Sequence, residues 1–148
     1  MNHSFKNMGR WVMLLVAVGA VAVWSSQTAA DDRDRNIDTA IRNTILLQIE
    51  AFANNDGEQA WAHASEGVKQ RFGSSDVFLS MVRQAYPAVH RARTIEFTER
   101  VPHGSFEIQT VKLQGPEGKR WDAYYRMVPS AEDWKIAGVR LHPADTGI

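Results

Sequence analysis

Residues 121–127 read WDAYYRM, and this stretch decides the fold because apolar and polar side chains alternate along it. A period of two is typical of a β-strand that buries one face. The side chains predicted to face the core are Trp121, Ala123, Tyr125 and Met127. Asp122, Tyr124 and Arg126 would point to the opposite face, towards solvent or an interface.

Three more segments have a strand pattern, at residues 95–98, 106–109 and 134–141. The connections between them are short and contain proline with glycine or serine. Such turns suit consecutive antiparallel strands. The sequence therefore predicts a four-stranded meander that ends before residues 142–143.

Two switches of the apolar side interrupt this alternation. Phe106 and Ile108 are taken as the buried side of their strand, so the buried side changes before Val111. It changes again between Ile136 and Val139. An extra residue in one strand of a pair produces such a switch and also bends the sheet. We therefore expect a β-bulge at each place and a curved sheet.

Helical spacing precedes the strands. The first apolar stripe consists of Ile37, Ile41, Ile45, Ile49 and Phe52. This period predicts a helix over residues 36–53, capped by Asn36 or Asp34.

Three shorter helices follow. Asp56 is predicted to cap a helix that runs to about Ala64, with Gln59 at the partner position of a capping box. Ser65 would cap a third helix, which Gly73 ends. A fourth begins after Ser74 or Ser75 and stops before Pro87.

Helices first and a meander second predict an α+β fold, with the N-terminal helices packed on a curved four-stranded antiparallel sheet to form a cone.

The first thirty residues have the organisation of a secretory signal peptide. Lys6 and Arg10 precede an uncharged run at residues 11–24, and small residues follow up to Ala30. The run of 14 residues would extend about 21 Å as a helix, less than the roughly 30 Å of a hydrocarbon core. We therefore expect cleavage near Ala30 and a secreted or periplasmic protein; the alternative is an uncleaved N-terminal membrane anchor.

The predicted domain organisation follows from this cleavage. Residues 1–30 form the signal peptide, residues 31–35 an exposed charged tether, residues 36–142 a single α+β domain, and residues 143–148 a C-terminal tail. The 118 residues after Ala30 are close to the usual size of one domain.

Composition excludes several classes of function. The chain has no cysteine, so it has no disulfide and no thiolate chemistry. After cleavage, 15 Lys and Arg oppose 17 Asp and Glu, which argues against nucleic acid or an anionic membrane as partner. The histidines are far apart, no metal motif is present, and no metal or other cofactor is expected.

Much of the chain resembles a bacterial family of domains of unknown function. The matching segments are Ala51-Phe52, Asn55-Asp56-Gly57, Ala60-Trp61, Ala64-Ser65, Phe72-Gly73, Phe78, Met81-Val82, Tyr86-Pro87-Ala88-Val89, Trp121-Asp122-Ala123-Tyr124-Tyr125 and Trp134-Lys135-Ile136-Ala137-Gly138. That family is similar in build to the nuclear transport factor two-like superfamily, which includes ketosteroid isomerases, dehydratases and polyketide cyclases. The resemblance implies a cone fold and transfers no activity.

Five side chains are the candidates for ligand binding. They are Tyr125, Trp121, His63, Trp61 and Tyr86, all predicted to line the space between sheet and helices. The Tyr125 hydroxyl could donate a hydrogen bond to a ligand, although ordinary core packing explains each of these residues as well. Asp56 and His63 are the candidates for a general base, but a helix cap explains Asp56 better.

The sequence favours a domain that binds a small apolar ligand or a protein partner without catalysing a reaction. The first alternative is a small cofactor-independent lyase or isomerase of the ketosteroid isomerase kind. The second is an interaction module that dimerises through the outer face of the sheet, where Tyr124 and Arg126 would be buried.

Overall fold

The computed structural model of the protein describes residues 20–131 and 133–145. Most of the predicted signal peptide therefore lies outside the described residues. Its last part, residues 20–30, is helical. The chain divides into two compact units, the first ending at Asn36 and the second running from Ile37 to Ile148.

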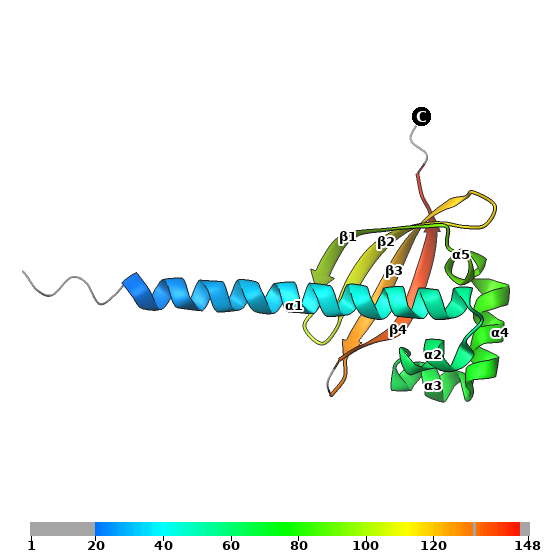
Figure 1. Ribbon diagram of the computed structural model, residues 1–148, viewed down its shortest axis with the longest axis horizontal. Helices are drawn as coiled ribbons and strands as arrows, with labels where there is room; N and C mark the ends of the chain where they lie inside the picture. Colours follow the sequence, from blue (N-terminus) through cyan, green and yellow to red (C-terminus); the bar gives the residue numbers. More distant parts are fainter. Residues whose placement is uncertain (1–19, 132, 146–148) are drawn as a thin grey trace, which may run out of the picture. The chain divides into compact units, whose positions relative to one another are not determined.

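The elements follow the predicted order, helices first and strands second (Figure 1). The helices are α1 (Ala20–Ala53), α2 (Gly57–Ala62), α3 (Glu66–Phe72), α4 (Ser75–Ala85) and α5 (Pro87–His90). The strands are β1 (Thr94–Pro102), β2 (Glu107–Gln114), β3 (Arg120–Pro129) and β4 (Trp134–Pro143). All neighbouring strands pair antiparallel in the order β1-β2-β3-β4. This confirms the α+β class, and the arrangement is consistent with a cone fold.

The first helix begins earlier than predicted. Neither Asp34 nor Asn36 caps it, because α1 starts at Ala20 and continues through residues 31–35. Those five residues are exposed, as expected of a tether, but they are helical. The stretch from 20 to 53 contains no proline or glycine to break the helix. Within the described ranges, no helix combines the length and apolar character that crossing a membrane requires.

The capping residues of the short helices are confirmed. The Asp56 side chain accepts a hydrogen bond from Gln59 N at 3.1 Å, and Ser65 accepts one from Val68 N at 3.3 Å. Ser74 caps α4 in the same way, through Val77 N. Gly73 ends α3 with φ 79°, a left-handed conformation that glycine adopts without strain.

One predicted bulge is confirmed and the other is wrong. In β4, Ala137 is the extra residue, because Arg126 pairs with Gly138 while Met127 pairs with Ile136. Between Ile108 and Val111, however, β2 pairs with β3 without interruption. The irregularity lies opposite, in β1, between Phe97 and Arg100.

The uninterrupted register reverses the predicted sides at the start of β2. Glu107 and Gln109 are buried, at 8% and 0% exposure, whereas Ile108 is only half-buried on the other face. Hydrophobicity alone favours burial of Phe106 and Ile108, because a hydrophobic pattern contains no information about polar partners on other strands.

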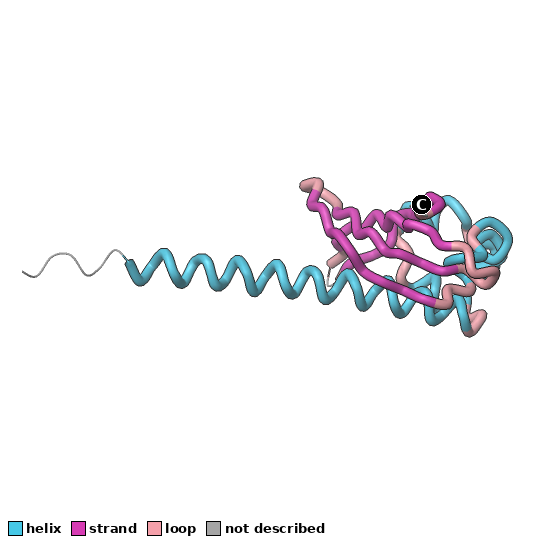
Figure 2. The backbone as a smooth tube through the Cα atoms, turned by 90° about the horizontal axis from the view of Figure 1, so that it is seen from above, coloured by secondary structure: helices cyan, strands magenta, loops and turns pink. Residues whose placement is uncertain are grey.

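The core lies between the sheet and the second half of α1. Ile41, Ile45, Ile49 and Phe52 are at most 4% exposed and belong to one cluster with β-strand residues such as Tyr125. Figures 1 and 2 show this half of α1 running alongside the inner face of the curved sheet, with α2 to α5 gathered at one end.

Candidate functional site

An apolar pocket lies where α3 and α4 meet α1 and β4. Its volume is about 270 Å³, near the lower end of the range for small-molecule sites. The lining residues are Gln48 and Phe52 of α1, Gly67, Val68, Arg71 and Phe72 of α3, Phe78, Met81 and Val82 of α4, Tyr86, Val89, and residues 136–139 of β4. We call this site the apolar pocket.

Backbone pairing to β4 holds α3 beside the pocket. His63 O accepts a hydrogen bond from Ile136 N, and Ser65 N donates one to Ile136 O, both at 2.9 Å. These bonds fix the connection between α2 and α3 against the strand. The bulge at Ala137 lies next to this contact, and residues 136–139 all reach the pocket wall. The bulge and the turn bonded beside it thus set the position of the pocket wall that residues 136–139 form.

Polar groups lie at two depths of the apolar pocket. Gln48 is 2% exposed, and its Nε2 donates to Ala60 O at 3.1 Å. Arg71 is exposed, like Gly67, so these two residues mark the mouth. The Arg71 guanidinium lies over the Phe72 ring, with Cζ 5.6 Å from the ring centroid. Of the described lining residues, Arg71 alone is charged.

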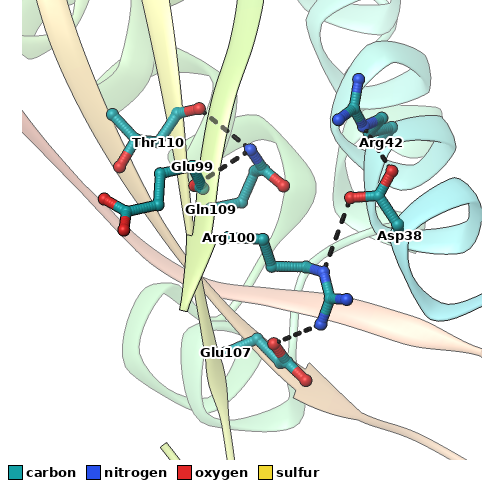
Figure 3. Close-up of polar contacts among 7 residues, drawn as sticks. All are labelled: Asp38, Arg42, Glu99, Arg100, Glu107, Gln109 and Thr110. Atoms are coloured by element: carbon teal, nitrogen blue, oxygen red, sulfur yellow. Dashed lines mark hydrogen bonds and ion pairs between the residues drawn. The ribbon is translucent and has the colours of Figure 1, made fainter. Parts of the chain in front are cut away.

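A polar cluster occupies the opposite, β1–β2 side of the same sheet face (Figure 3). Arg100 of β1 bridges α1 and β2: Nη1 donates to Glu107 Oε2 at 2.8 Å, and Nε lies 3.5 Å from Asp38 Oδ1. Asp38 also pairs with Arg42 at 2.8 Å. The Arg100 and Glu107 side chains are only 9% and 10% exposed. We call Asp38, Arg42, Arg100 and Glu107 the polar cluster.

Two buried polar atoms lie inward of this cluster. Gln109 and Tyr125 are directly opposite each other on β2 and β3, and both are fully buried. Gln109 Nε2 donates to the carbonyl oxygens of Glu99 and Thr110. Among the described residues, neither Gln109 Oε1 nor the Tyr125 hydroxyl has a hydrogen-bond partner. Burial raises the pKa of Tyr125 above its usual range, so the hydroxyl stays protonated and can donate.

Of the five residues predicted to bind a ligand, Tyr86 lines the apolar pocket. Trp61 lies behind the wall, with its ring 5.7 Å from Phe78, which does line the pocket. His63 is half-buried beside the β4 connection. Burial lowers the pKa of His63, and Lys135 lowers it further while Asp133 opposes them. His63 thus does not line the apolar pocket, and its backbone carbonyl holds the connection between α2 and α3 against β4.

Tyr125 and Trp121 lie farther along β3. Tyr125 is a fully buried core residue, and Trp121 is half-buried with Lys119 Nζ 4.2 Å from its ring centroid. Neither residue lines the apolar pocket. Their role in ligand binding stays a prediction.

The first candidate base lies outside the sheet–helix interior. Asp56 is exposed and caps α2, so its carboxylate faces solvent. Its backbone N–H donates to Ala51 O at 2.8 Å, which anchors the turn after α1. Asp56 thus has a structural explanation, and it does not line the apolar pocket, where a base would have to act.

The comparisons with known proteins identify the family. Residues 34–147 match the family described as a domain of unknown function, DUF4864. The chain belongs to the DUF4864 family. Searches of the curated proteins and of the solved structures found no match. The DUF4864 match spans every described strand and both sites above, so the apolar pocket and the polar cluster belong to the family domain.

Sequence reasoning missed both polar features of this DUF4864 domain. Arg71 was readable only as a basic residue in the last turn of a short helix, which is common. Glu107 and Gln109 alternate with apolar neighbours and so read as the solvent side of β2. The polar cluster could have been predicted from the opposite charges of Arg100 and Glu107, which stand on either side of the turn between two predicted strands. Across the described part of the chain, no group of three His, Cys, Asp or Glu lies close enough to hold a metal ion.

Proposed function

We propose that this DUF4864 domain binds a small, mainly apolar molecule in the apolar pocket without catalysing a reaction. The observation that carries the proposal is the pocket itself, about 270 Å³ of space walled chiefly by apolar and aromatic side chains. Apolar surface that a ligand covers leaves water, which contributes about 25 cal/mol for each Å² buried. Pockets with few polar groups are typical small-molecule sites.

A pair of valines provides the test. Val68 is half-buried in the pocket wall, whereas Val77 is 52% exposed on α4 and does not line the pocket. In Val68→Phe the larger ring would occupy ligand space; Val77→Phe adds the same atoms in solvent. Titration calorimetry with hexanol and decanol should show binding to the wild type and to Val77→Phe, and none to Val68→Phe.

The heat-capacity change identifies the kind of contact. Burial of apolar surface on binding gives a negative heat-capacity change, measured by repeating the titration at several temperatures. If wild type binds neither alcohol, or if Val68→Phe binds as well as wild type, the pocket is not the ligand site. Thermal unfolding of both variants ensures that lost binding does not reflect lost folding.

One observation supports the enzyme alternative, but the described residues offer no general base to act with it. The buried Tyr125 hydroxyl is a free donor among the described residues, as a ketosteroid isomerase-like site would need. Asp56 faces solvent, however, and Glu107, the carboxylate on the same inner face, is paired with Arg100. The proposal therefore assigns no reaction.

The dimer alternative rests on the outer face of the sheet. Tyr124 is 37% exposed there, and Arg126 is exposed with Cζ 4.5 Å from the Phe106 ring centroid. These residues face outward, as predicted. Size-exclusion chromatography with light scattering tests this alternative, since a monomer at high concentration would exclude it.

The proposed site of action is outside the cytoplasm. The pattern of residues 1–30 supports export and cleavage near Ala30. Expression of the full chain in a bacterium, followed by intact-mass measurement of the protein in the periplasmic fraction, tests this. A mass that starts at Asp31 agrees with cleavage; a full-length chain in the membrane fraction indicates the anchor instead.

A further inference from the structure

The structure also points to the chemical class of the ligand. We propose that the apolar pocket takes an amphipathic monocarboxylate, whose apolar body fills the pocket and whose carboxylate pairs with Arg71 at the mouth. This inference rests on the ligand-binding function proposed above and deepens it.

The first argument is the charge of the lining. Arg71 is the one charged side chain among the described lining residues, and none of those residues is acidic. An anion at the mouth would therefore meet a positive group and no negative one. A cationic ligand would meet the like charge of Arg71 there and no carboxylate among the lining residues.

The second argument is that Arg71 has no carboxylate partner within the described ranges. Its neighbour Lys69, on the same helix, pairs with Glu66 at 3.8 Å, and Arg42 pairs with Asp38 at 2.8 Å. The contact recorded for Arg71 is the face of Phe72, itself a lining residue. Stacking of this kind holds a guanidinium over an aromatic ring while its N–H groups stay free to donate.

The third argument places the carboxylate at the mouth and not at depth. Gln48, the buried polar residue of the lining, uses one N–H of Nε2 to bind Ala60 O and has no positive charge with which to pair a carboxylate. The remaining deep walls are apolar, and an unpaired carboxylate there would lose its hydration without compensation. A dicarboxylate is disfavoured for the same reason, since its second charge would enter the apolar interior.

The test compares ligands that differ only in the head group. Hexanoate and decanoate are titrated against the purified protein beside hexanol and decanol, with wild type, Arg71→Gln and Arg140→Gln. Arg140 is exposed on β4 and does not line the pocket, so its substitution changes net charge by the same amount. Arg71→Gln should weaken carboxylate binding about fivefold, the upper range for a solvent-exposed ion pair, and leave alcohol binding unchanged.

Salt gives a second readout. Carboxylate binding to wild type should weaken as the salt concentration rises, whereas alcohol binding should not. Arg140→Gln should behave as wild type in every titration.

The outcomes separate the two proposals. If the alcohols bind but the carboxylates bind no better, or if Arg71→Gln leaves carboxylate affinity unchanged, the ligand class is wrong while the pocket function survives. If neither alcohols nor carboxylates bind to wild type, both proposals fail. If Arg140→Gln weakens carboxylate binding as much as Arg71→Gln does, the effect is one of net charge and the assignment to Arg71 is overturned.

Discussion

The two sides of the inner sheet face fill the space beneath α1 in different ways. On the β1–β2 side, Arg100 lies between Asp38 and Glu107, and with Arg42 the polar cluster holds two positive and two negative charges. On the β4 side, the bulge at Ala137 and helices α3 and α4 surround an apolar space. The charges on the first side are paired within the chain, whereas the apolar side contains a pocket with Arg71 in its lining, a cation with no carboxylate partner among the described residues.

This difference leads us to assign the charged side to stability and, in our proposal, the apolar side to ligand binding. A buried cation between two carboxylates makes its contacts within the chain and offers little to a ligand. An unpaired guanidinium at the mouth of an apolar pocket can still form an ion pair with the anionic group of a ligand. The predictions below test the division, beginning with the largest expected effect.

Removing Arg100 should destabilise the domain most. Arg100→Leu leaves Glu107 buried without its cation, which costs about 3 kcal/mol of unfolding free energy or more. Urea denaturation followed by circular dichroism measures this. Arg140→Leu, at an exposed position, is the control and should change stability little.

A double variant sharpens the same prediction. Arg100→Leu with Glu107→Leu removes both charges and should recover part of the loss, because a buried pair is often replaceable by apolar side chains. If the single variant is as stable as wild type, the cluster does not stabilise this side of the sheet.

Removing the Tyr125 hydroxyl should have a smaller and opposite effect. An unpaired buried hydroxyl costs about 1–3 kcal/mol, so Tyr125→Phe should stabilise the domain by about 1 kcal/mol. A rise in the thermal unfolding midpoint measures it. A clear loss of stability would mean that the hydroxyl has a bound partner, and would reopen the role of Tyr125 as a ligand contact.

A fall in pH should first destabilise the end of the domain that holds α2 to α5, and this loss of stability should be the smallest of the three effects. His90 is 4% exposed, and its Nε2 lies 2.9 Å from Asn55 Oδ1 in the turn after α1. Burial lowers its pKa from the usual 6.5, and Arg83 and Arg91 lower it further. The neutral form is therefore the one that the fold stabilises. This contribution is complete above the ordinary pKa and is lost as the pH falls through the folded value.

The measurement is the unfolding free energy between about pH 7 and about pH 5, the range in which histidine titrates. Wild type should lose stability on acidification, and His90→Gln should lose less. His63 has the same direction of shift, so His63→Gln should also flatten the curve. Equal slopes in all three proteins would show that neither histidine contributes.

The sequence predicted the elements well where local chemistry decides them. Ser65 and Gly73 have side-chain or backbone properties that define a helix start and end, and the structure places α3 between them. The period-two alternation of residues 121–127 likewise depends only on neighbours along the chain, and β3 buries the expected side. The start of α1 was missed because the charges at residues 31–35 are compatible with both a helix and a tether.

The sites were less predictable because they depend on pairing between distant segments. Glu107 and Gln109 face inward since β2 keeps its register with β3 and since Arg100 supplies a partner. Neither condition is visible in the alternation of residues 106–109. The pocket depends on the space between α3, α4 and β4, of which only Tyr86 was anticipated.

The bulge at Ala137 bears on how this pocket could arise or disappear in evolution. A deletion at most positions of a strand turns the following side chains to the opposite face. Deletion of Ala137 would instead restore a regular ladder, with Gly138 still opposite Arg126 and Val139 still opposite Tyr125. We expect such a chain to keep its fold and lose part of the pocket wall, so the loss of a single codon would alter the proposed binding site without altering the sheet.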